Sequence, residues 1–150
     1  MIRSVFLDSG PLGLLTAPSR RSETRTCARW LADLVAAGVD VIIPEIADYE
    51  VRRELLRAGK TASVKRLDAL ALATRYLPIT TVAMRHAAEL WAQARQQGQP
   101  TAADNTIDAD MILAAQVLTS NLPDPVIATT NVGHLARFCT AALWHTITTP

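Results

Sequence analysis

Acidic and polar side chains follow the apolar runs of this sequence, at positions where a strand of a sheet would end. Asp8 comes directly after the run from Ile2 to Leu7, and Thr129 closes the run that begins at Val126. In an open α/β sheet, ligands bind outside the carboxyl ends of the strands. If the first and fourth strands are neighbours, one edge of the sheet gathers Asp8, Glu50, Asp108, Asp110, Thr129, Thr130 and Asn131.

Several carboxylates at one edge predict a divalent cation. Like charges and burial both disfavour ionised carboxylates, and a bound cation compensates for both effects. Mg²⁺ takes oxygen ligands, keeps several waters and contacts phosphate oxygens, and Mn²⁺ prefers similar ligands. Such an ion can activate a water and stabilise the charge of a phosphodiester under in-line attack. The acids therefore predict metal-dependent phosphoester hydrolysis.

The first two acids also have structural interpretations. Asp8 is typical of a turn or a helix N-cap. Glu50 is compatible with an exposed helix charge, although Ile46 and Ala47 one turn earlier place it near the buried boundary, where an unpaired carboxylate needs a reason. Weaker competitors for its role are Glu45, Asp48 and Glu54.

The third acid requires a choice between two neighbours. Asp108 and Asp110 are two residues apart, so on a helix their side chains point roughly 200° from one another. We favour Asp110 as the ligand, because it lies one turn before the small pair Ala114 and Ala115, which predicts close approach of helix and sheet. Asp108 is then a supporting acid, or the assignment of the two is reversed.

Strands that alternate with helices must position these residues. Residues 8–11 indicate a turn, and residues 99–105 indicate a loop. Buried strands are predicted at residues 2–7, 39–43, 77–80, 126–129 and 143–147. Apolar spacing and glycine stops predict helices at residues 22–37, 45–58, 62–76, 81–97 and 107–118. Such βαβ units predict one α/β domain over residues 1–150, with a mostly parallel sheet covered on both faces.

Composition narrows the class of protein. A chain of 150 residues with 49% hydrophobic and 19% charged residues is typical of one folded domain and excludes wholesale disorder. No apolar run reaches the ~18 residues that a membrane span needs. The N-terminus meets Asp8 before a signal-peptide core could form, and Cys27 and Cys139 are too far apart for a disulfide framework. We therefore expect a cytoplasmic protein with two reduced thiols.

The formal net charge of +1 does not indicate a polyanionic partner, but the basic residues are unevenly distributed along the sequence. One stretch, residues 20–29, has four arginines and the single acid Glu23, and a second covers residues 52–66. Local basic surface of this kind can attract phosphates. The alternative is a solvated helix face with some ion pairs.

Four motifs resemble the PIN-domain ribonucleases, and in particular the VapC-type toxins of VapBC toxin–antitoxin pairs. They occur in the family's order and span nearly the whole chain. The most specific part is the D-x-x-x-A-A helix followed by T-x-N after a strand. The motifs are Asp8 after its apolar run, Tyr49-Glu50-Val51, Asp110-Met111-Ile112-Leu113-Ala114-Ala115 and Thr129-Thr130-Asn131-Val132-Gly133-His134-Leu135.

The resemblance implies a PIN-like three-layer α/β/α sandwich with a five-stranded sheet in the order 3-2-1-4-5. It implies RNA cleavage that leaves a 5′-phosphate, with Mg²⁺ or Mn²⁺ held by Asp8, Glu50 and Asp110. Asn131 occupies the fourth acidic position of the family, and Thr129 matches a hydroxyl that orients a carboxylate or water. The implied partners are an RNA substrate, a small antitoxin protein and a second copy of the chain, with no membrane.

Two further hypotheses concern the surroundings of the acids. Arg52 and Arg53 directly follow Glu50, so at least one of them could contact the RNA backbone. Haloacid-dehalogenase phosphatases also place an acid after the first strand, but Gly10 stands where they need a second one. The non-enzymatic alternative is a degenerate PIN-like scaffold that binds RNA or protein, supported by the uncharged Asn131.

Overall fold

Five short strands form one sheet in the order β3-β2-β1-β4-β5, and all four pairings are parallel. The computed structural model describes residues 1–18, 20–98 and 104–149, with the backbone alone for residues 104–107. The predicted order and direction of the strands are confirmed. The strands are β1 (Ser4–Leu7), β2 (Asp40–Pro44), β3 (Arg75–Leu77), β4 (Pro125–Thr129) and β5 (Ala141–Leu143).

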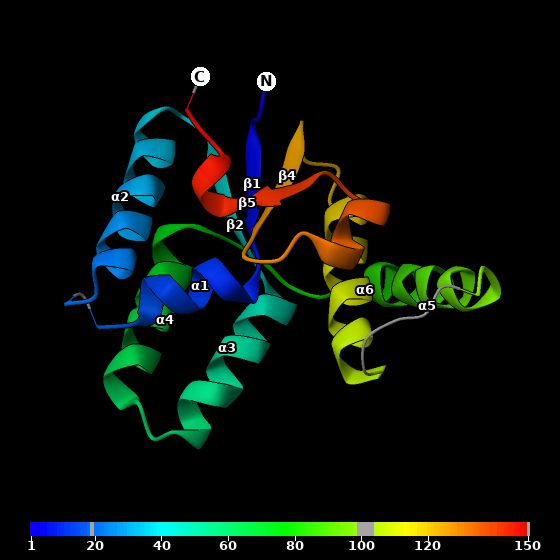
Figure 1. Ribbon diagram of the computed structural model, residues 1–150, viewed down its shortest axis with the longest axis horizontal. Helices are drawn as coiled ribbons and strands as arrows, with labels where there is room; N and C mark the ends of the chain where they lie inside the picture. The colour runs from blue at the N-terminus through cyan, green and yellow to red at the C-terminus, as the bar shows by residue number, and fades with distance from the viewer. Residues whose placement is uncertain (19, 99–103, 150) are drawn as a thin grey trace.

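Helices cover both faces of the sheet (Figure 1). In that view α1, α2 and α4 lie on one side of β1, α3 runs below its end, and α5 and α6 lie on the other side. The helices are α1 (Ser9–Thr16), α2 (Ser22–Ala36), α3 (Glu45–Arg57), α4 (Thr61–Ala73), α5 (Thr81–Gln96) and α6 (Asp104–Thr119), with the short 3₁₀ helices η1 (Gly133–Arg137) and η2 (Trp144–Thr146). No helix in the described residues is long and apolar enough to cross a membrane.

The core divides between the two faces because side chains alternate along a strand. Val5, Val41 and Val126 pack with the first four helices, which contribute Leu12, Cys27, Leu34, Ala47 and Leu67. Phe6, Ile42 and Ile127 point to the other face and pack against Leu113 and Val117 of α6. Strands buried on both sides read as continuous apolar runs, which explains why they were predictable. Cys27 and Cys139 are free thiols, as predicted.

Several predicted boundaries were wrong. Residues 9–16 form α1 where a turn at 8–11 was predicted, because Asp8 caps a helix that accommodates Gly10 and Pro11 in its first turn. The predicted helix 62–76 ends at Ala73, and the third strand is 75–77 instead of 77–80. The fifth strand is 141–143, and most of the predicted 143–147 strand is η2.

The predicted loop at residues 99–105 falls largely outside the described residues, since 99–103 are not described. Its last two residues already belong to α6, which begins at Asp104. Asp108 and Asp110 therefore lie in the second turn of this helix and not in its first.

A buried glutamine ties α3 to the opposite layer. Gln116 of α6 is 1% exposed. Its Oε1 accepts from the Ile46 N–H at 3.2 Å, and its Nε2 donates to the Leu77 carbonyl at 2.9 Å. The first N–H groups of a helix have no partner within it, so this side chain satisfies one of them. The contact fixes the start of α3 against α6 and β3.

Candidate metal and phosphodiester site

Asp8 leaves β1 at the carboxyl end of the sheet and serves as the N-cap of α1. Its Oδ1 accepts from the Ser9 N–H at 2.7 Å, and its Oδ2 accepts from the Thr129 hydroxyl at 2.7 Å. Thr129 ends β4, which pairs with β1, and it is 1% exposed. The helix-cap prediction for Asp8 is confirmed together with its position at the strand end. The carboxylate is thus held in one orientation by the neighbouring strand.

A close backbone approach next to Asp8 depends on Gly10, a residue whose role the sequence did not reveal. A Cβ at Gly10 would lie 2.5 Å from Thr130 Oγ1 and 2.6 Å from Thr130 Cγ2. Such separations are well inside van der Waals contact, so the loop after β4 can lie against the start of α1 only if position 10 is glycine. The glycine directly after Asp-Ser was the available signal.

Glu50 lies in the middle of α3 and is partly buried. The pKa of its carboxyl is raised to about 7, mainly by burial and also by the charges of Asp8 and Asp110, against a lowering effect of Arg53. Among the described residues, Glu50 forms no ion pair and accepts no hydrogen bond. A buried carboxylate without a partner is costly, so this position favours a ligand that supplies positive charge.

The three competitors for the role of Glu50 all have structural partners. Glu45 Oε1 accepts from the Ile79 N–H at 2.8 Å. Asp48 is buried, and it accepts from Arg52 at 3.0 Å and from the Tyr76 hydroxyl at 2.8 Å. Glu54 is exposed and pairs with Arg57 at 2.9 Å. Each of these contacts explains its acid without a ligand.

Asp110 is partly buried and senses the charge of Asp8, whereas Asp108 is exposed. Burial raises the pKa of Asp110 to about 6, and the charge of Asp8 contributes to the shift. Like Glu50, Asp110 has no hydrogen bond or ion pair with any residue that the structure describes. Asp8, Glu50 and Asp110 therefore influence one another from β1, α3 and α6, while Asp108 on the same helix points away.

Asn131 joins this network through its backbone. Its N–H donates to Thr129 Oγ1 at 3.1 Å, so the threonine hydroxyl both accepts from Asn131 and donates to Asp8. The Asn131 side chain is exposed. The loop after β4 thus supports the Asp8 carboxylate, and the amide of Asn131 remains accessible to a ligand.

The two arginines after Glu50 have different surroundings. Arg52 bridges Asp48 at 3.0 Å and Asp68 at 2.8 Å, and so joins α3 to α4. Arg53 is exposed, and its guanidinium carbon lies 5.1 Å from the centre of the Tyr49 ring. Its positive charge lowers the pKa of Glu50. A hollow of about 350 Å³ between α1 and α3 is lined by Ser9, Gly13, Thr16, Glu50, Val51, Arg53, Glu54 and Leu55. This geometry favours Arg53 over Arg52 as a contact for an anionic ligand.

A family model for the PIN domain matches residues 5–138 of the chain. This match covers all four motifs and most of the sheet. The chain belongs to the PIN domain family. PIN domains are usually nucleases and generally use a divalent metal. No curated protein matches the chain significantly.

Solved structures share the fold of this PIN domain at low sequence identity. VapBC2 from Rickettsia felis, bound to a DNA fragment from its promoter, has 14% identity and a TM-score of 0.70, and the match covers 94% of this chain and 98% of that one. VapBC-1 from nontypeable Haemophilus influenzae has 17% identity and a TM-score of 0.68, covering 95% and 98%. FitAcB from Neisseria gonorrhoeae has 19% identity and a TM-score of 0.63, covering 95% and 99%.

The acids of this PIN domain fit a hard divalent cation in donor type. All are oxygen ligands, and two of them have pKa values raised by burial and by neighbouring acids. Within the described residues, no three His, Cys, Asp or Glu side chains lie close enough together to hold one ion. Mg²⁺ commonly binds through one or two carboxylates, several waters and substrate phosphates, so it does not require three direct side-chain ligands.

Proposed function

We propose that this PIN domain is a metal-dependent endoribonuclease that hydrolyses RNA phosphodiester bonds. One observation carries the proposal: Asp8, Glu50 and Asp110 interact electrostatically from three different elements, and Glu50 and Asp110 form no hydrogen bond or ion pair with any described residue. Buried carboxylates that repel one another are stabilised by a cation. The proposal agrees with the family's usual activity.

In this proposal Asp8, Glu50 and Asp110 would bind Mg²⁺ or Mn²⁺, with one or two of them in direct contact with the ion and the rest through its bound waters. When bound, the ion supplies a nucleophilic water at neutral pH and stabilises the charge of the phosphate under attack. Thr129 keeps Asp8 oriented through its 2.7 Å hydrogen bond, and the Asn131 amide binds a water or the substrate. The proposed set of catalytic residues is therefore Asp8, Glu50, Asp110, Thr129 and Asn131.

Residues around the acids complete the proposed site. Arg53 is exposed beside Glu50, so its guanidinium can contact an RNA phosphate there. We assign this contact to Arg53 and give Arg52 a structural role, because two carboxylates already bind Arg52. Asp108 is exposed, and we propose for it at most an outer, water-mediated contact.

The decisive test is cleavage of total cellular RNA and of a panel of tRNA and single-stranded RNA, with Mg²⁺ or Mn²⁺ and with EDTA controls. Asp8→Asn and Asp110→Asn should abolish cleavage. Asp108→Asn should retain it, because the same change of charge on the same helix falls on an exposed side chain. Cleavage that survives EDTA or both inactivating substitutions contradicts the proposal. Absence of both metal binding and cleavage favours the scaffold that binds RNA or protein without catalysis.

We further propose that the chain is the toxin of a toxin–antitoxin pair and forms a homodimer. The similar structures, which are VapBC and FitAcB complexes, support this assignment. Expression should arrest growth, and co-expression of the neighbouring small gene should relieve the arrest. Light scattering of the purified chain tests the dimer directly, and a monomeric mass contradicts it.

A further inference from the structure

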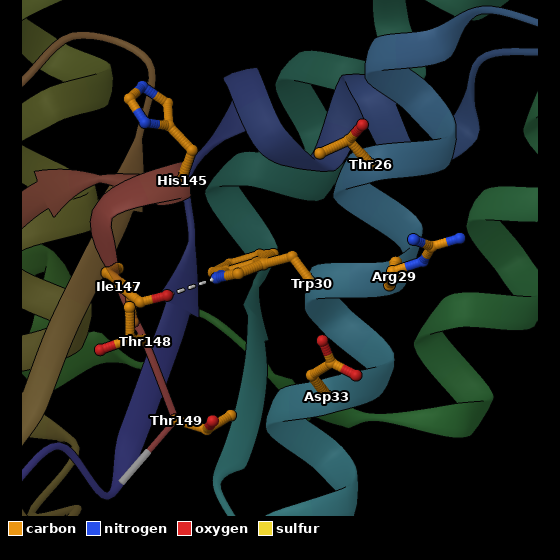
Figure 2. A pocket seen from close by; sticks show the side chains of 8 residues that line it. All are labelled: Thr26, Arg29, Trp30, Asp33, His145, Ile147, Thr148 and Thr149. Carbon is orange, nitrogen blue, oxygen red and sulfur yellow. Dashed lines mark hydrogen bonds between the residues drawn. The ribbon is translucent and has the colours of Figure 1, made fainter.

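Two adjoining hollows on the outer face of α2 lie apart from the acids. The larger, of about 300 Å³, is formed by α2 and the C-terminal segment after β5 (Figure 2). The smaller, of about 230 Å³, lies further toward the start of α2, and both are lined by Thr26 and Arg29. Together they form one groove, which we call the α2 groove. Its lining residues also include Ser22, Arg25, Asp33, His145, Thr148 and Thr149.

The floor of the α2 groove is fixed in place. The Trp30 indole N–H donates to the Ile147 carbonyl at 2.9 Å, as the dashed line in Figure 2 shows. Trp30 also makes an edge contact with the ring of Trp144 at 5.5 Å. These contacts hold the C-terminal segment against α2, so the groove is a built feature of the fold.

The lining of the groove is suited to phosphate groups. Arg25 and Arg29 are one turn apart and stand on one face of the helix, and hydroxyl groups accompany them. Asp33 is the single carboxylate among the lining residues. The structure gives Arg29 no ion pair with any residue that it describes. The Thr26 hydroxyl already donates to the Ser22 carbonyl, so the hydroxyl donors are Ser22, Thr148 and Thr149. A guanidinium without an ion-pair partner beside such donors favours an anionic, hydrogen-bonding ligand.

Helix α1 connects the proposed active site with α2, the helix that lines the groove. Asp8 caps α1, and α1 contacts both α2 and α3. Figure 1 shows α1 leading from the end of β1 toward the first turns of α2. With eight residues, α1 spans about 12 Å, and Arg29 lies seven residues into α2, about 10 Å further along that helix, so an RNA of several nucleotides is needed to extend from the acids to Arg29.

We infer that the α2 groove binds the phosphodiester backbone of the RNA substrate away from the scissile bond, with Arg29 as its central contact. This inference rests on the proposed ribonuclease function. The contact is sequence-independent, and it acts on the binding of long RNA without touching the reacting phosphate. An RNA that is only long enough to occupy the proposed active site does not reach Arg29.

Salt-dependent RNA binding tests the inference. Affinity of a fluorescent single-stranded RNA would be measured over a range of salt concentrations with the Asp110→Asn protein, which does not cleave it. Each phosphate contact to single-stranded RNA contributes a slope of about 0.7 in log K against log salt, or about fivefold in affinity near ~0.1 M salt. Arg29→Gln should therefore reduce the salt slope by about 0.7 and weaken RNA binding about fivefold near ~0.1 M salt. The double variant Arg25→Gln, Arg29→Gln should reduce the slope and the affinity further.

The control is Arg85→Gln, since Arg85 is an exposed arginine of α5 on the other side of the sheet. It should leave the slope unchanged, and thermal unfolding should show that all variants are folded. In the cleaving protein, Arg29→Gln should raise KM for a long RNA and leave kcat and the cleavage of a trinucleotide unchanged. An effect of Arg29→Gln no larger than that of Arg85→Gln overturns the inference alone. Failure of the Asp110→Asn protein to bind RNA at low salt instead overturns the proposed function.

Discussion

Replacing Glu50 by glutamine should stabilise the metal-free protein at neutral and higher pH, and have little effect near pH 4.5. The pKa of Glu50 is about 7 in the folded chain, against 4.5 for an ordinary glutamate, because the carboxyl is partly buried near Asp8 and Asp110. The folded state therefore holds a proton that the unfolded state releases. Stability of the wild type falls as pH rises from 4.5 to about 7, and the full penalty persists above that range.

The size of the effect follows from the difference between the two pKa values. At about 1.4 kcal/mol for each tenfold change in proton affinity, the gap between 4.5 and about 7 corresponds to about 3 kcal/mol. Glu50 keeps some contact with solvent, which screens its charge, so we expect about 1–2 kcal/mol. For a domain of this size such a gain raises Tm by about 2–8 °C.

Thermal unfolding of the wild type and Glu50→Gln at about pH 5 and about pH 8.5 measures this gain. Glu54→Gln, one turn further on the same helix, is the matched control, because Glu54 is exposed and paired with Arg57. The Glu50 variant should gain stability only at the higher pH, and added Mg²⁺ should raise the Tm of the wild type more than that of the variant. A variant that is equally stable or less stable than the wild type at both pH values would refute the reasoning.

Three other substitutions test contacts around the acids. Thr129→Val removes the hydroxyl that orients Asp8, so it should reduce cleavage at least tenfold. Urea unfolding should show a loss of about 1–2 kcal/mol of stability. Full activity of the variant would contradict the role of the hydroxyl. Gly10→Ala should lower the free energy of unfolding by about 1–3 kcal/mol, because the added Cβ clashes with the Thr130 side chain. In a double-mutant cycle Thr130→Gly should recover part of that loss, and additive losses would exclude the clash. Asp48→Ala leaves buried donors without their acceptor and should lower the free energy of unfolding by about 3 kcal/mol; a change below about 1 kcal/mol would show that the network contributes little.

The sequence by itself determined the elements at the centre of the fold. Apolar-rich runs of four to six residues predicted β1, β2 and β4, because strands buried on both faces need continuous apolar side chains. Helical spacing and glycine stops predicted α2, α3 and α5 within about two residues at each end. The four motifs also identified the family. These signals are local, so one chain without its structure is sufficient to read them.

Edge strands and the first helix depended on the tertiary structure. β3 and β5 have three residues each, too few for a periodic pattern. They form because the backbones of the adjacent strands β2 and β4 provide hydrogen-bonding partners. Helix α1 contains Gly10 and Pro11 at its start, a combination that locally indicates a turn. Burial of Leu12 beneath the sheet and the capping by Asp8 outweigh that preference.

The partner of each charged group was likewise decided only in three dimensions. The motif indicated Asp110, and the fold turned it toward Asp8 while leaving Asp108 in solvent. The sequence did not distinguish the adjacent Arg52 and Arg53. In the structure Arg52 forms ion pairs with two carboxylates, Asp48 of α3 and Asp68 of α4, and Arg53 has no such pair among the described residues. Charge interactions depend on distance and burial, and packing of elements remote in sequence sets both. Residue types thus specified the chemistry available to this chain, and the packing of its layers decided which side chains could take part in it.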